Sequence, residues 1–129
     1  MESLIQEFVN QRMWAVVGAS TDASKNGNRI FRDLRKAGYA VYGVNVRGGE
    51  IEGQQLYRSL ADLPEQPAVV DIVVPPNVTE QVVQQCAELG ITRVWMQPGS
   101  ESESAIGFCE GHGIQVVYGT CAMIRKRAW

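Results

Sequence analysis

Residues 14–38 read WAVVGASTDASKNGNRIFRDLRKAG, and they contain the signals of a strand, a glycine-bearing loop and a helix in succession. The run from Trp14 to Val17 is apolar and ends at Gly18, which is typical of a strand buried on both faces of a sheet. From Gly27 onward apolar residues recur with the helical period, and Gly38 stands where a C-terminal cap glycine is expected. This stretch therefore predicts one β-strand, loop and α-helix unit.

The same unit recurs along the rest of the chain. Further strands are predicted at 40–46, 69–74, 91–96 and 114–118, and further helices at 78–89 and 102–110. A short amphipathic helix is expected over 2–11, within an N-terminal extension of residues 1–12, and a helical turn over 59–64, with the glycine-rich stretch between 47 and 58 left as a loop. Alternating strands and helices predict an α/β fold: a doubly wound, mainly parallel, five-stranded sheet in a three-layer αβα arrangement.

Length and composition narrow the class of protein. A chain of 129 residues, 45% hydrophobic and 20% charged, suits one domain over 1–129 and is not the composition of a disordered chain. We expect no separate catalytic domain, and hence no catalysis by this chain alone. The net charge of −2 does not indicate a nucleic-acid binder, although nine of the twelve basic residues are Arg, the better residue for bidentate phosphate contacts.

Other residue counts bear on metals and on the cellular compartment. One histidine, His112, and three scattered cysteines at 86, 109 and 121 lack the spacing of a zinc site, so we expect no metal. The first residues are acidic, and no long apolar run follows them. These patterns predict a reduced, cytoplasmic protein without a signal peptide or a membrane span.

The loop after the first strand is the first candidate ligand site, because ligands of open α/β sheets bind beyond the carboxyl ends of the strands. Gly18 permits a tight turn, Ser20 and Thr21 offer hydroxyl groups, and Gly27 lets a helix begin close to the strand with free N–H groups facing an anion. Lys25 of the same loop joins the predicted phosphate contacts. The spacing is not G-x-G-x-x-G, and an ordinary loop in which Ser20 or Asn26 caps the helix is the alternative.

The end of the second strand bears on which nucleotide is bound. NAD sites place an Asp or Glu about 20 residues past the glycine loop, where it holds the ribose hydroxyls. Here Asn45 stands instead, with Arg47 two residues on. This disfavours NAD and permits a ligand with an extra ribose phosphate, such as NADP or coenzyme A (CoA). A solvated surface arginine is the alternative for Arg47.

The ends of the third and fourth predicted strands carry two prolines and a side-chain amide, which could contact a ligand in different ways. Pro75 and Pro76 fix the chain and remove N–H donors, which suits the flat face of a ligand, or they simply stop the strand before a helix capped by Asn77. Gln97 can bond a ligand amide or satisfy backbone groups of its own turn. No acid–base pair stands out, so we predict no catalytic residue; Cys121 is either a reactive thiol or a packed side chain.

The order of several short motifs resembles the stand-alone CoA-binding domain proteins, which are similar to the N-terminal domain of the succinyl-CoA synthetase α subunit. The motifs that carry the resemblance span about residues 12–124: Val16-Val17-Gly18-Ala19-Ser20, Gly27-Asn28-Arg29-Ile30, Val44-Asn45-Val46, Tyr57-Arg58-Ser59-Leu60-Ala61-Asp62-Leu63-Pro64, Val70-Asp71-Ile72-Val73-Val74-Pro75-Pro76, Val94-Trp95-Met96-Gln97-Pro98-Gly99 and Cys121. Two motifs depart from it, since Asn45-Val46 replaces Asn-Pro and Gly119-Thr120-Cys121 replaces Asp-Arg-Cys.

The resemblance implies a Rossmann-like fold that binds CoA or acyl-CoA without catalysing a reaction. The residues it places around the ligand fall into four groups: Gly18, Ala19, Ser20, Asn28 and Arg29 at the phosphates, Asn45 and Arg47 near the ribose or 3′-phosphate, Val74, Pro75 and Pro76 near the adenine or pantetheine, and Gln97 across the cleft. The alternatives are an NADP-type oxidoreductase, or an interaction protein that kept the fold without its ligand. In the latter the basic tail, Arg125 to Trp129, would matter more; a frayed terminus is the alternative for that tail. A homodimer is conceivable because a sheet edge needs cover.

Overall fold

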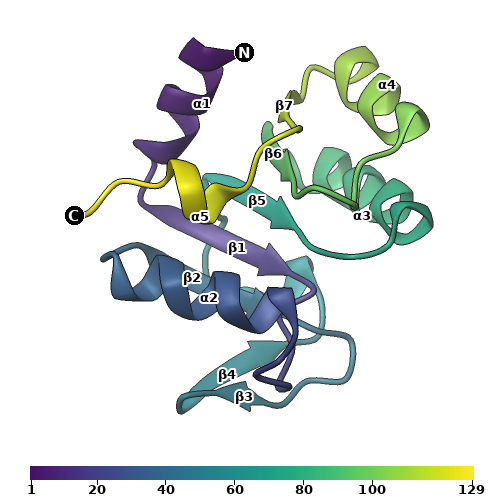
Figure 1. Ribbon diagram of the computed structural model, residues 1–129. Helices are drawn as coiled ribbons and strands as arrows, with labels where there is room; N and C mark the ends of the chain where they lie inside the picture. The colour runs from purple at the N-terminus through teal and green to yellow at the C-terminus, as the bar shows by residue number, and fades with distance from the viewer.

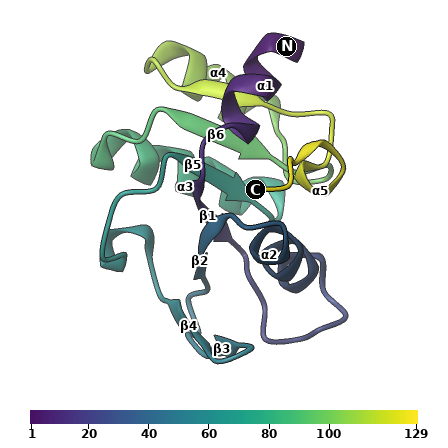
Figure 2. The same cartoon turned by 90° about the vertical axis from the view of Figure 1, so that its left-hand side faces the viewer.

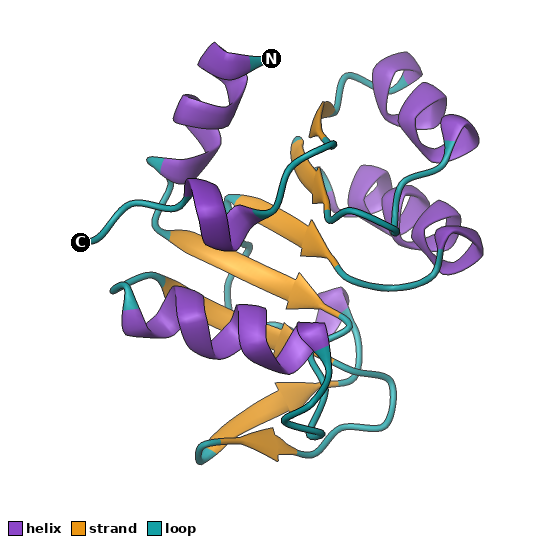
Figure 3. Ribbon diagram, in the orientation of Figure 1, coloured by secondary structure: helices purple, strands orange, loops and turns teal.

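The computed structural model describes residues 1–129 and shows a sheet enclosed by two layers of helices (Figures 1 and 3). The elements run in the order α1 (Glu2–Val9), β1 (Met13–Val17), α2 (Asn26–Lys36), β2 (Ala40–Val44), β3 (Glu50–Ile51), β4 (Gln54–Tyr57), the 3₁₀ turn η1 (Leu60–Asp62), β5 (Val69–Ile72), α3 (Pro76–Leu89), β6 (Arg93–Met96), α4 (Glu103–Gly111), β7 (Gln115–Val117) and α5 (Ala122–Arg125). None of these helices is long and apolar enough to cross a membrane.

The strand order is β3-β4-β2-β1-β5-β6-β7, and every pair is parallel except the β3–β4 hairpin. The chain moves outward from β1 through β2 to β4, then returns and builds β5 on the other side of β1. The order therefore reverses between β1 and β5, which is where a crevice opens at the carboxyl ends of the strands. The doubly wound α/β arrangement expected from the sequence is confirmed.

Two apolar cores lie on opposite faces of the sheet, because successive side chains of a strand point to opposite faces. Trp14 and Val16 of β1 pack with Trp95 in the core beneath α1, α2 and α5. Ala15 and Val17 join the core beneath α3 and α4. Figure 2 shows α3 on one side of the sheet and α2 and α5 on the other.

The sheet has seven strands rather than the five expected, because residues 50–57 form a hairpin where the sequence predicted a loop. Its two-residue turn, Glu52-Gly53, has positive φ at both positions (49° and 79°), as type I′ turns require. Ile51 and Leu56 are buried, and β4 pairs with β2. The sequence did not predict the hairpin because two adjacent polar residues, Gln54 and Gln55, interrupt the alternation of apolar and polar residues that is typical of strands.

The expected helix caps differ in the structure. The helix α3 begins at Pro76 with Pro75 as its N-cap, so Asn77 lies in the first turn and is not the cap. Proline is tolerated there because the N–H it lacks would have no partner within the helix. The helix α2 begins at Asn26 after Lys25, and no side chain caps it.

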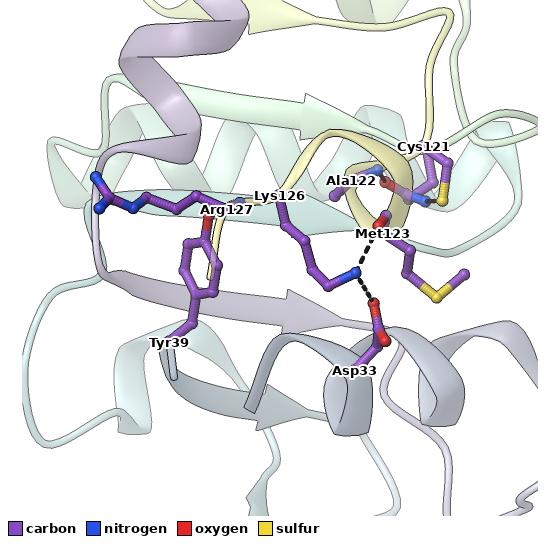
Figure 4. A network of polar contacts seen from close by, with 8 residues as sticks. Asp33, Tyr39, Cys121, Ala122, Met123, Lys126 and Arg127 are labelled. Atoms are coloured by element: carbon purple, nitrogen blue, oxygen red, sulfur yellow. Dashed lines mark hydrogen bonds and ion pairs between the residues drawn. The ribbon is translucent and has the colours of Figure 1, made fainter. Parts of the chain in front are cut away.

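The last residues pack against the molecule instead of fraying. Lys126 Nζ lies 2.8 Å from Asp33 Oδ2 on α2, and the Arg127 N–H donates to Tyr39 Oη at 3.0 Å; Figure 4 shows both contacts. The ring of Trp129 meets that of Tyr39 edge-on, with 5.5 Å between centroids, and the Arg127 guanidinium lies 4.3 Å from the Trp129 ring. The tail thus ties the C-terminus to α2 and to the start of β2.

Asp71 occupies a position in the middle of β5 where an apolar side chain is normal. It is fully buried, and neither carboxylate oxygen has a hydrogen-bond partner. In register it lies between Val16 and Trp95, so its side chain is on the face covered by α5. Burial raises the pKa of Asp71 well above its ordinary value, because the ionised form would stand uncompensated in an apolar core.

Candidate functional site

The site begins where β1 ends against α2 at unusually short range. Gly18 has φ of +102°, and a Cβ there would lie 2.2 Å from the Val73 carbonyl oxygen. A Cβ on Gly27 would lie 1.9 Å from the Gly18 carbonyl oxygen. Only glycine fits both positions, and together they bring the first turn of α2 against the strand end.

Two asparagines hold the loop between these glycines from either side. The Asn28 side chain, 3% exposed, donates from Nδ2 to the Ser20 carbonyl oxygen at 2.8 Å. The Asn45 side chain donates from Nδ2 to the Ala19 carbonyl oxygen, also at 2.8 Å. Their Oδ1 atoms are used too, accepting from Arg32 Nε and from the Arg47 N–H respectively. The structure therefore gives Asn28 and Asn45 the task of positioning the loop.

The braced loop leaves hydrogen-bond donors free. The backbone N–H groups of Ser20, Thr21, Asn26 and Gly27 donate to no acceptor within the protein. The Ser20 Oγ accepts from the Asp22 N–H at 3.1 Å and still has its own proton to donate. Lys25 and Arg29 are exposed beside the helix start. Free amides at a helix N-terminus, with cations nearby, can hold an anion such as phosphate.

A groove of about 540 Å³ opens next to this loop, between the ends of β1 and β2 and the flank of α3. Its walls are largely apolar, with six valines: Val17, Val44, Val46, Val74, Val78 and Val82. The polar part of the lining consists of Gly18, Asn45, Arg58, Gln81, Gln84, Gln85 and Glu88. Its size and its mixture of apolar walls with a few polar groups are typical of small-molecule sites.

Arg58 is the only basic side chain that lines the groove. It follows β4, and its Nη1 donates to the Val46 carbonyl oxygen at 3.3 Å, which holds the guanidinium across the end of β2. Arg47, the cation expected from the sequence, is exposed and lies outside the groove lining. The sequence missed Arg58 because its strand, β4, was not predicted, so nothing placed residue 58 beside β2.

Three of the predicted site residues, Gly18, Asn45 and Val74, line the groove itself. The phosphate candidates Ala19, Ser20, Thr21, Lys25, Asn28 and Arg29 gather at the loop and helix start instead. Pro75 and Pro76 are exposed at the start of α3. Gln81 and Gln85, which the sequence did not single out, come four residues apart on one face of α3 beside Val78 and Val82; that spacing is the signal that could have found them.

Gln97 lies apart from the groove and is 4% exposed. Its Oε1 accepts the Ala122 N–H at 3.0 Å, and its Nε2 donates to Cys121 Sγ at 3.0 Å. Both ends of this amide are therefore occupied by the C-terminal segment. Cys121 is half-buried at the start of α5, while Cys86 and Cys109 are buried in the core beneath α3 and α4, where desolvation raises the thiol pKa values to about 12 and 11.

Taken with the strand order, the glycine loop and the groove at the reversal point define a Rossmann-like domain of the doubly wound α/β class. The chain belongs to the CoA-binding domain family, whose profile matches residues 12–127.

Relatives of known name are much longer enzymes. The chain is 37% identical over 92 residues to the α subunit of ADP-forming acetate–CoA ligase II from Pyrococcus furiosus, an alignment that covers 70% of this chain and 20% of that subunit. It is 34% identical over 93 residues to the α subunit of ligase I of the same organism, again covering 20% of the relative. The chain thus spans about a fifth of the length of these curated relatives.

Solved structures extend the same likeness to proteins of similar size. A conserved hypothetical protein from Pyrococcus furiosus superposes with a TM-score of 0.85 at 42% identity, covering 89% of this chain and 99% of the other. A hypothetical protein from Pyrococcus horikoshii gives a TM-score of 0.91 at 30% identity, with 97% and 89% coverage. A dinucleotide-forming acetyl-coenzyme A synthetase from Candidatus Korarchaeum cryptofilum gives 0.77 at 28% identity, covering 96% of this chain and 30% of the enzyme.

Proposed function

We propose that this protein binds CoA or an acyl-CoA by its nucleotide end and supplies binding without catalysis. The adenosine lies in the valine-walled groove, and the diphosphate lies over the loop from Gly18 to Thr21. The observation that carries the proposal is the position of the groove, which opens beside the glycine loop at the strand-order reversal, in a chain of the CoA-binding domain family.

Arg58 is assigned to the 3′-phosphate, the group that separates CoA from ADP and from NAD. It is the only cation in the groove lining, and it lies across the end of β2, where the ribose of a nucleotide is bound in doubly wound folds. A guanidinium matches the geometry of phosphate oxygens and stays charged at all physiological pH values. The valines can stack on the adenine, and Gln81 and Gln85 offer amides to its edge.

Calorimetric titration with CoA, dephospho-CoA, NADP and NAD tests this assignment. We expect CoA to bind tightest and the Arg58→Ala variant to lose about 10- to 100-fold of CoA affinity, the usual cost of one charge-assisted hydrogen bond. Dephospho-CoA should bind wild type and variant alike, since it lacks the group that Arg58 contacts.

Arg47→Ala is the matched control. Arg47 is also exposed and also follows a strand at this edge, but it does not line the groove, so we expect its loss to change CoA affinity less than about threefold. Equal losses in the two variants would contradict the placement of the 3′-phosphate. Tighter binding of NADP than of CoA would instead support a dinucleotide-binding oxidoreductase, and no binding of any of the four would support an interaction protein.

A further inference from the structure

The carboxyl ends of β5, β6 and β7 differ from those of β1 and β2 in what they offer a ligand. Pro75 follows β5 and Pro98 follows β6, and both are exposed. Proline has no N–H to donate. A ligand that crosses this part of the edge therefore contacts the ring carbons of the prolines. At the end of β1 it would instead contact unpaired backbone N–H groups.

Two polar side chains at this second half of the edge, Gln97 and Trp95, bond to the C-terminal segment. The Gln97 side-chain amide bonds at both ends, donating to Cys121 Sγ and accepting from the Ala122 N–H. The Trp95 indole N–H donates to the Thr120 carbonyl oxygen at 3.0 Å. Ser100 is 5% exposed, and its N–H donates to the Gln97 carbonyl oxygen. The C-terminal segment thus occupies the hydrogen-bonding atoms of Gln97 and Trp95, two side chains at the end of β6.

The surface here is also not hollowed as it is beside β2. Of four hollows on the surface, one is the groove already described, and the others lie over α2, beside the β3–β4 hairpin and beside the stretch from Leu60 to Pro67. None of the four is lined by a residue between 97 and 121. In doubly wound folds an extended ligand crosses the reversal point, so one held at the β1–β2 side is expected to run toward the ends of β5, β6 and β7.

We propose that the protein does not discriminate between acyl groups. It binds the nucleotide end of CoA and leaves the sulfur, with any acyl chain attached to it, outside the fold. This inference rests on the proposed function and specifies its substrate class as CoA and its thioesters of any chain length. A thioester held in this way stays accessible to a separate enzyme, so the chemistry suits a carrier or a sensor of the total CoA pool.

A series of ligands that differ only beyond the sulfur tests the inference. Affinities for CoA, acetyl-CoA, butyryl-CoA and hexanoyl-CoA should agree within about threefold, whereas an enclosing acyl pocket would add roughly fourfold for each buried methylene. A CoA whose sulfur carries a bulky maleimide adduct should bind as well as CoA. Adenosine 3′,5′-bisphosphate, which has no pantetheine arm, should retain measurable binding.

Variants at the two halves of the edge separate the possible failures. Pro98→Ala and Ile124→Ser alter exposed residues of the second half and should leave every affinity unchanged, while Arg58→Ala should weaken CoA and hexanoyl-CoA by the same factor. A preference above about tenfold for one chain length, or rejection of the maleimide adduct, overturns this inference and leaves CoA binding intact. No binding of CoA itself overturns the proposed function, and the inference with it.

Discussion

The parallel strands all end along one side of the sheet, and the two halves of this carboxyl edge share their architecture but differ in the surface they expose. At the ends of β1 and β2, glycines bring the backbone close, asparagines brace a loop, and free N–H groups border a groove. At the ends of β5, β6 and β7, Pro75, Pro98 and the C-terminal segment cover the edge, and the Trp95 and Gln97 side chains bond to that segment. Parallel strands place many carboxyl strand ends along one edge of the sheet. Only the half of that edge that stays uncovered and keeps unpaired hydrogen-bond donors can bind a ligand.

The open half depends on the contact between β1 and α2, and breaking it should have the largest effect. In Gly27→Ala the added Cβ would lie 1.9 Å from the Gly18 carbonyl oxygen, a backbone atom that cannot swing away. We expect a loss of about 3 kcal/mol of unfolding free energy, at the upper end of overpacking effects, and loss of CoA binding. Urea unfolding and calorimetry measure the two.

Gly107→Ala provides the matched control for that substitution. Gly107 is also a helical glycine, but a Cβ there would meet nothing within 4 Å. Alanine should stabilise α4 by up to about 1 kcal/mol, because glycine is the poorer helix former. If the two alanine variants are equally stable, the close approach of strand and helix is not what shapes the open half.

The buried carboxyl of Asp71 lies in the middle of β5, on the face of the sheet that α5 covers. Its ionisation should make stability depend on pH. Since burial raises the pKa of Asp71 in the folded state, the folded protein binds this proton more tightly than the unfolded chain does. At pH values below the pKa that Asp71 has in the unfolded chain, the carboxyl is protonated in both states and does not lower the free energy of unfolding. Between that pKa and the higher folded-state pKa, the free energy of unfolding falls by about 1.4 kcal/mol per pH unit.

Asp71→Asn removes the titrating group and keeps its size. We expect the free energy of unfolding of the variant to depend less on pH between 4 and 7. It should exceed that of wild type by the largest amount at the upper end of this range. Denaturant unfolding at a series of pH values measures this. An unchanged pH profile would mean that water or a shift of the chain solvates the carboxylate in solution.

The last residue of the chain, Trp129, packs beside Tyr39 at the start of β2, away from both halves of the edge, and its removal should give the smallest effect. Trp129→Ala removes the edge-on contact with Tyr39 and the cation–π contacts with Arg12 and Arg127. We expect a loss of about 1–2 kcal/mol, mainly from the aromatic pair and the Arg127 cation–π contact at 4.3 Å; the Arg12 contact, at 5.5 Å, is close to the distance limit and adds little. CoA affinity should stay within about twofold of wild type, because Trp129 does not line the groove. A larger drop would show that packing at the start of β2 is coupled to the open half.

Much of the fold could be predicted from the sequence because its signals are local. Apolar runs such as Trp14 to Val17 and the helical spacing after Gly27 depend only on near neighbours in the chain. The hairpin at 50–57 was missed because Ile51 and Leu56 are buried by distant elements, while Gln54 and Gln55 read as loop. Likewise, Gly18 and the loop after β1 could be found by motif, but Arg58 could not, because nothing near it in the sequence links it to the end of β2.

The sequence by itself determined the α/β class, the glycine-bearing loop after the first strand and the family. Tertiary structure alone decided which arginine lines the groove, that the Asn28 and Asn45 amides hold the loop, and that Gln97 is held by Ala122 and Cys121. The physical reason is that secondary structure follows from periodicity over a few residues, whereas a binding surface depends on donors that stay unpaired after packing. Which donors stay unpaired is settled between segments far apart in the sequence, such as Gln97 and Ala122, 25 positions apart, or Glu7 and Arg93, 86 positions apart.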